Sequence, residues 1–152
     1  ARGLGTAPQG AFADPRDARL GWRAYDGRPS EEGVDWPATR IAALVPESGI
    51  ELTPDTFILE AGFERLDGVD FRKGCYVGQE VTARMKHKTE LKKGLARVLV
   101  EGGAPPGTPI EADGKSVGTL YTQADGAGIA HLRYAQARSE MRAGEATVRY
   151  ET

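Results

Sequence analysis

The only cysteine of the chain stands among residues that could give it chemistry. Cys75 lies in RKGCYVGQE, residues 72–80, where two cations precede it, two glycines bracket it and a carboxylate follows. Cations and a helix amino terminus stabilise the thiolate, the form of cysteine that acts as a nucleophile or binds a metal. Arg72 and Lys73 supply the cations, and a helix expected from Gly78 would supply the terminus. The alternative is a small buried thiol in a tight turn.

Three roles are open to such a thiolate. Nucleophilic catalysis needs a base within hydrogen-bond reach, but His87 would lie about 13 Å along the expected helix, and His131 could approach only through the fold. Redox sensing often uses a second, resolving cysteine, which this sequence does not contain. A thiolate suits an iron–sulfur cluster, but a cluster takes about four ligands. Cys75 could therefore hold a cluster only at a site shared with another protein.

The composition bounds the class of protein. The chain has 152 residues, of which 39% are hydrophobic and 28% charged, as in an ordinary folded domain. A net charge of −2 argues against nucleic acid as a partner, and no apolar run approaches the roughly 18 residues that would span a membrane. One cysteine cannot form an internal disulfide, so we expect a reducing compartment and a cytoplasmic protein. The opening ARGLGTAPQG lacks an initiator methionine and a signal peptide, and we expect a piece of a longer protein.

Charge is unevenly distributed along the chain. Eight cations and two carboxylates between Arg72 and Arg97 give this segment +6, which leaves −8 for the remainder. Such a basic segment could attract an anionic group. Charge alone, however, favours a solvated helix face followed by a charged strand entry.

The first ninety residues predict a mixture of helices and short extended pieces. Residues 18–25 alternate as a strand does, and 57–66 are apolar but of ambiguous type. A helix is expected from Trp36 to Val45, because Asp35 can cap it and a proline occupies its first turn. Residues 69–71 suggest a short extended piece. A second helix is expected from Gly78 to about Lys88, with Val81 and Met85 on its buried side.

After Lys93 the pattern changes to short strands separated by Gly/Pro turns. Strands are expected at 95–100, 110–112, 117–121, 129–134 and 146–150. Asp113-Gly114 is a hairpin signal between the second and third of these. The fold class is therefore α+β, with a mixed domain over 1–90 and an antiparallel β-barrel over 91–152.

The motif around the cysteine resembles a known family signature. Residues 73–80, KGCYVGQE, match the KGCYxGQE signature of YgfZ-type proteins, which belong to the folate-binding, aminomethyltransferase-like (GcvT-related) superfamily and assist iron–sulfur cluster assembly or repair. The matching positions are Lys73, Gly74, Cys75, Tyr76, Gly78, Gln79 and Glu80. The stretches 20–23, 59–62, 68–71 and 81–84 also look like family sequence, and the similarity runs from about residue 14 to the end.

The resemblance implies a folate-dependent accessory factor for iron–sulfur clusters. This chain would be the C-terminal half of a three-domain protein, with the N-terminal half and iron–sulfur assembly or client proteins as partners. Cys75, supported by Lys73, would be the reactive thiolate or a shared iron–sulfur ligand. Tetrahydrofolate would be the cofactor, and the residues expected to face its pocket are Trp22, Arg23, Arg40 and Glu60. The alternatives to a place in the pocket are ordinary ones: Trp22 could pack in the core, and Arg40 and Glu60 could form a structural ion pair.

Two other functions fit the same sequence. An aminomethyltransferase of the glycine cleavage system belongs to the same superfamily, but its transfer chemistry depends on an acidic residue in the N-terminal part. The β-barrel could instead serve only as a protein-docking module. Whether the protein is an enzyme therefore stays open. We expect this chain alone to bind tetrahydrofolate weakly or not at all, because the pocket would be incomplete.

Overall fold

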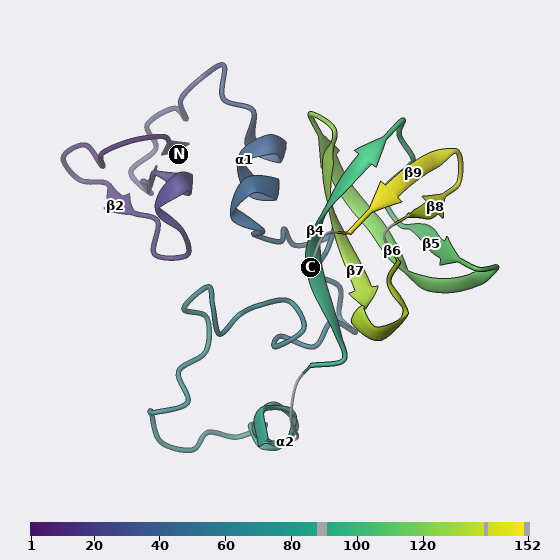
Figure 1. Cartoon of the computed structure of the whole chain (residues 1–152). Coiled ribbons are helices and arrows are strands. Elements are labelled where there is room, and N and C mark those ends of the chain that lie inside the picture. The colour runs from purple at the N-terminus through teal and green to yellow at the C-terminus, as the bar shows by residue number, and fades with distance from the viewer. Residues whose placement is uncertain (88–90, 139, 151–152) are drawn as a thin grey trace.

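Six antiparallel strands close into a barrel in the C-terminal part of the chain (Figure 1). The computed structural model describes residues 1–87, 91–138 and 140–150. Around the barrel the strand order is β4-β7-β6-β5-β8-β9. Their bounds are β4 Lys93–Glu101, β5 Thr108–Ala112, β6 Lys115–Ala124, β7 Ala127–Arg133, β8 Met141–Ala143 and β9 Ala146–Arg149. The expected α+β fold with a C-terminal antiparallel barrel is confirmed, although residues 151–152 of the expected range lie outside the described residues.

The alternation of side chains explains why these segments form a barrel. In β9, Ala146 and Val148 are buried while the residues between and after them are not, as the two-residue period of a strand requires. Asp113 and Gly114 join β5 to β6 with φ of 51° and 72°. Both central residues of this two-residue hairpin turn thus have the positive φ that it needs. The sequence-based hairpin is confirmed.

The N-terminal part contains a small sheet and one helix. The sheet has the order β1-β3-β2, from strands β1 Arg2–Gly3, β2 Phe12–Ala13 and β3 Trp22–Arg23. The strand expected over 18–25 is wrong for most of its length, because only two residues pair. The Asp17 carboxylate accepts a hydrogen bond from the Arg19 amide and starts the 3-10 turn η1, Ala18–Leu20, in place of extended chain.

Helix α1, Trp36–Ala43, confirms the first predicted helix. Asp35 Oδ1 accepts a hydrogen bond from the Ala38 amide at 2.8 Å, as an N-cap residue does. Leu44 ends the helix in the left-handed conformation, so the helix stops before Val45. Ile41 on this helix is buried.

The segment that carries the motif is less regular than expected. Residues 58–67 form consecutive turns, and 69–71 do not form a strand. Helix α2, Glu80–His87, begins two residues later than predicted and has no buried residue. Val81 is 54% exposed, so its expected place on a buried side is wrong, whereas Met85 is half-buried. Lys88, where the helix was expected to end, lies outside the described residues.

The barrel packs directly against the preceding part of the chain. Leu95, Ala127 and Ile129 of the barrel form one apolar cluster with Ile41 of α1 and Ala61. Glu60 also accepts a hydrogen bond from the Leu95 amide through its backbone oxygen at 2.8 Å. In the described part of the chain, we find no helix of the length and apolarity that crossing a membrane demands.

Candidate functional site

The loop before α2 holds Cys75 at the surface. Gln79 fixes the end of this loop, since its side-chain Oε1 accepts a hydrogen bond from the Tyr76 amide at 2.9 Å. Gly78 has a φ of 88°, which favours glycine in the turn between them. Glu80 then places a carboxylate in the first turn of the helix, where the helix dipole favours it. The motif residues Gly78, Gln79 and Glu80 thus start α2, while Cys75 stays exposed.

The cations of the motif contact other groups. Lys73 Nζ lies 5.2 Å from the centre of the Tyr76 ring, a cation–π distance. Arg72 Nε forms an exposed ion pair with Asp70 Oδ1 at 3.3 Å. Since α2 begins at Glu80, its amino terminus also lies further along the chain than the sequence suggested. That Lys73 supports a Cys75 thiolate stays a prediction.

The structure gives no contact between either histidine and Cys75 in the described part of the chain. His131 Nε2 lies 3.0 Å from Glu60 Oε2, in the barrel wall. His87 is exposed at the end of α2. Among the described residues no group of three or more His, Cys, Asp or Glu side chains could hold a metal ion. The metal role expected for Cys75 stays a prediction.

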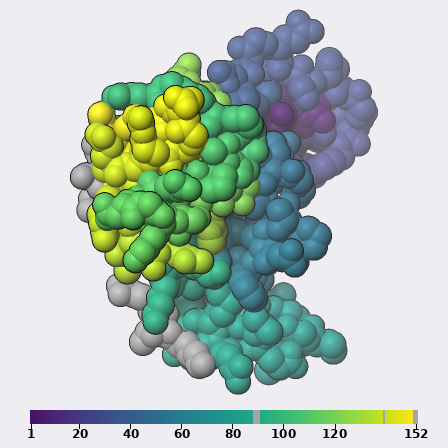
Figure 2. All heavy atoms as spheres, turned by 90° about the vertical axis from the view of Figure 1, so that its right-hand side faces the viewer, coloured from purple at the N-terminus to yellow at the C-terminus, as the bar shows by residue number. Residues whose placement is uncertain are grey.

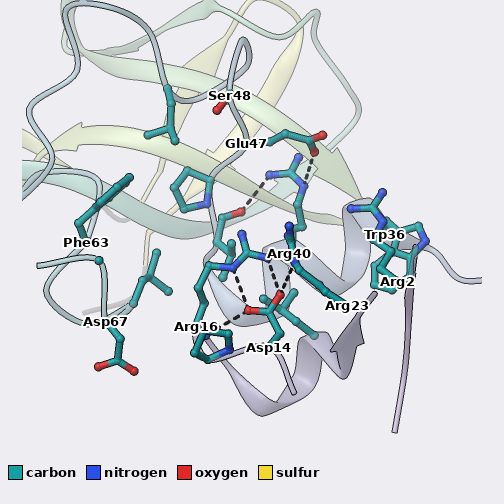
Figure 3. Close-up of a pocket in the computed structure, with 17 residues that line it drawn as sticks. Arg2, Asp14, Arg16, Arg23, Trp36, Arg40, Glu47, Ser48, Phe63 and Asp67 are labelled. Atoms are coloured by element: carbon teal, nitrogen blue, oxygen red, sulfur yellow. Dashed lines mark hydrogen bonds and ion pairs between the residues drawn. The ribbon is translucent and has the colours of Figure 1, made fainter. Parts of the chain in front are cut away.

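A cavity of about 580 Å³ lies between the small sheet, α1 and the loops that follow (Figure 3). Its walls combine guanidinium groups, carboxylates and aromatic rings. The polar and aromatic residues among those that line it are Arg2, Asp14, Arg16, Arg23, Trp36, Arg40, Glu47, Ser48, Phe63 and Asp67. Such a lining suits a ligand with a flat ring and an anionic group.

Asp14 organises one wall of this cavity. Its carboxylate is almost fully buried and receives hydrogen bonds from Arg16 Nη2 at 2.7 Å and Arg23 Nε at 2.8 Å (Figure 3). Burial raises the pKa of Asp14, but the two arginines outweigh burial and lower the pKa to about 2. Both guanidinium groups are thereby held at the cavity surface.

Arg40 organises another part of the cavity wall. Its guanidinium is buried and donates to the Val45 carbonyl, to Glu51 Oε2 at 3.1 Å and to Thr122 Oγ1 at 2.7 Å. Glu47 Oε2 lies 3.0 Å from Arg40 Nε at the edge of the cavity. Because Thr122 belongs to β6, this network also ties the cavity to the barrel.

Two of the four residues expected in a folate pocket line this cavity. Arg23 and Arg40 do, whereas Trp22 packs its ring beside Gly3, where an added Cβ would lie 2.4 Å from it. Glu60 lines a separate cavity of about 170 Å³ together with Lys93 and His131. The ion pair considered between Arg40 and Glu60 is not formed, because Arg40 pairs with Glu47 and Glu51 instead.

Sequence reasoning missed Asp14, Arg16 and Arg2 as cavity residues and treated Trp36 only as a helix start. Arg2 lies over the Trp36 ring at 4.2 Å, which brings the first strand to α1. One local signal could have revealed the Asp14–Arg16 pair. The spacing Asp-x-Arg recurs at 14–16, 17–19, 26–28 and 70–72, and each time the aspartate accepts hydrogen bonds from the arginine two residues on.

Comparison with known proteins identifies the type of barrel. Residues 92–152 match the family model of the CAF17 C-terminal beta-barrel domain. The mitochondrial iron–sulfur cluster assembly factor IBA57 of Mus musculus is 37% identical over 145 residues, which cover 84% of this chain and 39% of the relative. Its Homo sapiens counterpart is 35% identical over 138 residues, covering 78% and 38%. An IBA57 homologue of Neurospora crassa is 41% identical over 117 residues, covering 69% and 27%.

These relatives correct the expected cellular location and leave the YgfZ type untested. All three are named as mitochondrial proteins, so the cytoplasmic location expected from the single cysteine is wrong. The chain spans about two fifths of the length of the first two. The YgfZ type of the motif stays a prediction. The barrel, in contrast, is of the CAF17 C-terminal type.

Proposed function

We propose that this chain works in iron–sulfur cluster assembly and presents Cys75 to a partner protein as one ligand of a shared cluster or as a transfer point. The exposure of Cys75 in a loop closed by Gln79 carries this proposal. A buried structural thiol would not need such a position. The names of the IBA57 relatives, which are cluster assembly factors, support the same role.

Cys75→Ala tests the proposal. The protein and the variant are purified without oxygen together with iron–sulfur assembly proteins of the same organism, and bound iron, sulfide and visible absorption are compared. We expect the variant to lose most of the cluster held jointly with the partner, because a methyl group cannot bind iron. Equal cluster content in both proteins would sink the proposal.

The state of the thiol can be tested without a partner. An exposed Cys75 should react with an alkylating reagent in the native protein, and Lys73→Ala should slow the reaction if the lysine supports the thiolate. Reaction only after denaturation would make Cys75 a structural residue. The function would then have to depend on the cavity.

The arginine-lined cavity supports a second part of the proposal, a folate site. Trp36 and Phe63 offer faces for a ring, while Arg16 and Arg23 offer donors to a carboxylate. When bound, tetrahydrofolate would supply a carrier for one-carbon units. We expect calorimetric titration of this chain with tetrahydrofolate to give weak binding or none, and tight binding would show that the cavity is self-contained.

A further inference from the structure

One end of the larger cavity combines an aromatic ring with several guanidinium groups. Figure 3 shows Arg2, Trp36 and Arg23 on one side of the cavity and Phe63 and Asp67 on the other. Arg2 Cζ lies 4.2 Å from the centre of the Trp36 ring. In Figure 2 the purple N-terminal residues, from which the arginines at this end come, lie to one side of the green and yellow barrel.

The charges at this end of the cavity do not cancel. Among the residues that line the cavity, Asp14 balances one of its two arginines, and Glu47 balances Arg40. The remaining carboxylate of the lining, Asp67, lies on the other side (Figure 3). Arg2 and one guanidinium of the Asp14 pair therefore leave a surplus of two positive charges at this end.

The arginines of the cavity differ in what they can still bind. All three side-chain nitrogens of Arg40 contact protein oxygens. Asp14 accepts from Arg23 through Nε alone, so Nη1 and Nη2 of Arg23 lie outside this pair. It accepts from Arg16 through Nε and Nη2, so Nη1 of Arg16 lies outside the pair. Arg16 and Arg23, but not Arg40, can thus donate to a ligand.

Asp14 fixes the direction of both guanidinium groups. Its side chain is 1% exposed, and its Oδ2 accepts from Arg16 and from Arg23 at the same time. Burial raises the pKa of Asp14, but the two arginines lower it to about 2, so the carboxylate stays charged at neutral pH. Planar guanidinium forks that are already held in place lose little freedom when they bind an anion.

We propose that Arg2, Arg16 and Arg23 form an anion subsite, that Asp14 is its positioning residue, and that it takes a ligand with two negative charges next to a flat ring. An aromatic phosphate ester and an aromatic dicarboxylate share this chemistry, and guanidinium groups bind both kinds of oxygen. This inference deepens the folate part of the proposed function, because it names the charge that the cavity takes and the residue that sets it.

Small anions test the subsite, because its arginines and Asp14 all belong to this chain. Calorimetric titrations at pH 8 and constant ionic strength compare phenyl phosphate, 4-aminobenzoylglutamate and benzenesulfonate. Phenyl phosphate carries two charges at this pH, and 4-aminobenzoylglutamate carries two carboxylates, whereas benzenesulfonate has a similar ring and one charge. We expect a dianion to bind at least about tenfold more tightly than benzenesulfonate. No saturable binding of either dianion, or equal binding of benzenesulfonate, would overturn the proposal.

Variants of the subsite separate positioning from charge alone. Arg23→Gln should weaken dianion binding about tenfold, because two donors and one charge are lost. If Asp14 acted only as a negative charge, Asp14→Asn would tighten the binding of an anion, whereas a positioning residue predicts about tenfold weaker binding. Arg16→Lys keeps the charge but loses the planar fork and should also weaken binding, which tests the same point if Asp14→Asn does not fold. Binding that is tighter or unchanged in a folded Asp14→Asn, or unchanged in Arg16→Lys, would contradict the role of Asp14.

The pair Asp26–Arg28 supplies the matched controls. It has the same Asp-x-Arg spacing and the same kind of hydrogen bonds, but it lies outside the cavity. Asp26→Asn and Arg28→Gln should therefore bind both dianions as the unmodified protein does. A loss in these controls equal to that in Asp14→Asn and Arg23→Gln would mean that general charge, not the subsite, attracts the anions.

The two dianions separate this inference from the folate proposal. If phenyl phosphate binds in a way that depends on Arg23 while 4-aminobenzoylglutamate does not bind, the subsite stands and the folate part fails. If 4-aminobenzoylglutamate binds but the affinity of neither dianion depends on Arg23 or Asp14, the folate part stands and the subsite fails. The cluster part of the proposed function uses no residue of the cavity, so Cys75→Ala reports on it separately.

Discussion

Arg40 places a buried positive charge where α1, the following loop and the barrel meet. The Glu51 carboxylate that it contacts has a fully buried side chain. Arg40→Ala would leave this carboxylate without its cation, which costs about 3–5 kcal/mol of unfolding free energy. Urea denaturation at pH 7 measures the loss.

The exposed ion pair Arg149–Glu101 provides the control for this prediction. Arg149→Ala should cost about 1 kcal/mol or less, because exposed pairs contribute little. Replacing Arg40 and Glu51 together by methionines should recover part of the loss, since no charge is then left buried. Equal losses for Arg40→Ala and Arg149→Ala would show that the buried network adds no stability.

Asp14 should make stability depend on pH in the acid range. Its pKa is lowered from an ordinary 3.8 to about 2 in the folded protein. A carboxylate with a depressed folded-state pKa stabilises the fold above the unfolded pKa, and this contribution is lost as the pH falls through about 2. The shift corresponds to about 2 kcal/mol at neutral pH.

Asp14→Asn should therefore lower the free energy of unfolding at pH 7 and approach the unmodified protein near pH 2. Urea denaturation at several pH values gives the difference directly. Asp26→Asn is the control: the hydrogen bonds from Arg28 also lower the pKa of Asp26 to about 2, but this pair is exposed, so solvent screening should make its effect on stability smaller. A difference that stays constant with pH would mean that the Asp14 charge is not what stabilises this wall of the cavity.

At the scale of elements, the sequence predicted what depends on local pattern. The strands at 95–100 and 146–150 and the hairpin at Asp113-Gly114 follow from alternation and turn chemistry, and α1 follows from its cap. The three-stranded sheet could not be predicted, because strands of two residues show no period. Nor could the exposure of Val81, since how α2 packs depends on residues distant in the sequence. The cavity joins residues from Arg2 to Gly68, and only the fold brings them together.

The barrel strands β6 and β7 depend on a glycine at their contact. A Cβ added at Gly118 would lie 2.3 Å from the His131 carbonyl oxygen and 2.7 Å from a Leu132 methyl group. Gly118→Ala must therefore shift a paired backbone, and overpacking of this kind costs about 1–3 kcal/mol. Thermal or urea unfolding measures the change.

Gly114→Ala is the matched comparison for Gly118→Ala. Gly114 has a φ of 72° and no neighbour within 4 Å of an added Cβ. Alanine there meets only the cost of the left-handed conformation, about 1–2 kcal/mol. We expect Gly118→Ala to destabilise more than Gly114→Ala, and the reverse order would mean that turn conformation limits the barrel more than strand packing does.

At the scale of the whole molecule, the cluster of Ile41, Ala61, Leu95, Ala127 and Ile129 crosses the boundary expected near residue 90. The Arg40–Thr122 and Glu60–His131 contacts cross it as well. Two regions of sequence that look separate therefore share part of one core. The division into domains 1–90 and 91–152 stays a prediction. Whether the two regions unfold separately can be measured.

We expect the two regions to unfold in one transition. The two tryptophans, Trp22 and Trp36, both precede the barrel, so their fluorescence reports the first region, while far-UV circular dichroism reports mainly the barrel strands. Coincident urea midpoints from the two probes would indicate a single cooperative unit. Ile41→Ala, which opens a cavity in the shared cluster, should lower both midpoints together and cost about 2–5 kcal/mol. Leu99→Ala, on the more exposed side of β4, is the control and should change either midpoint little. If the fluorescence transition occurred at a lower urea concentration than the dichroism transition, the barrel would hold together without the first ninety residues.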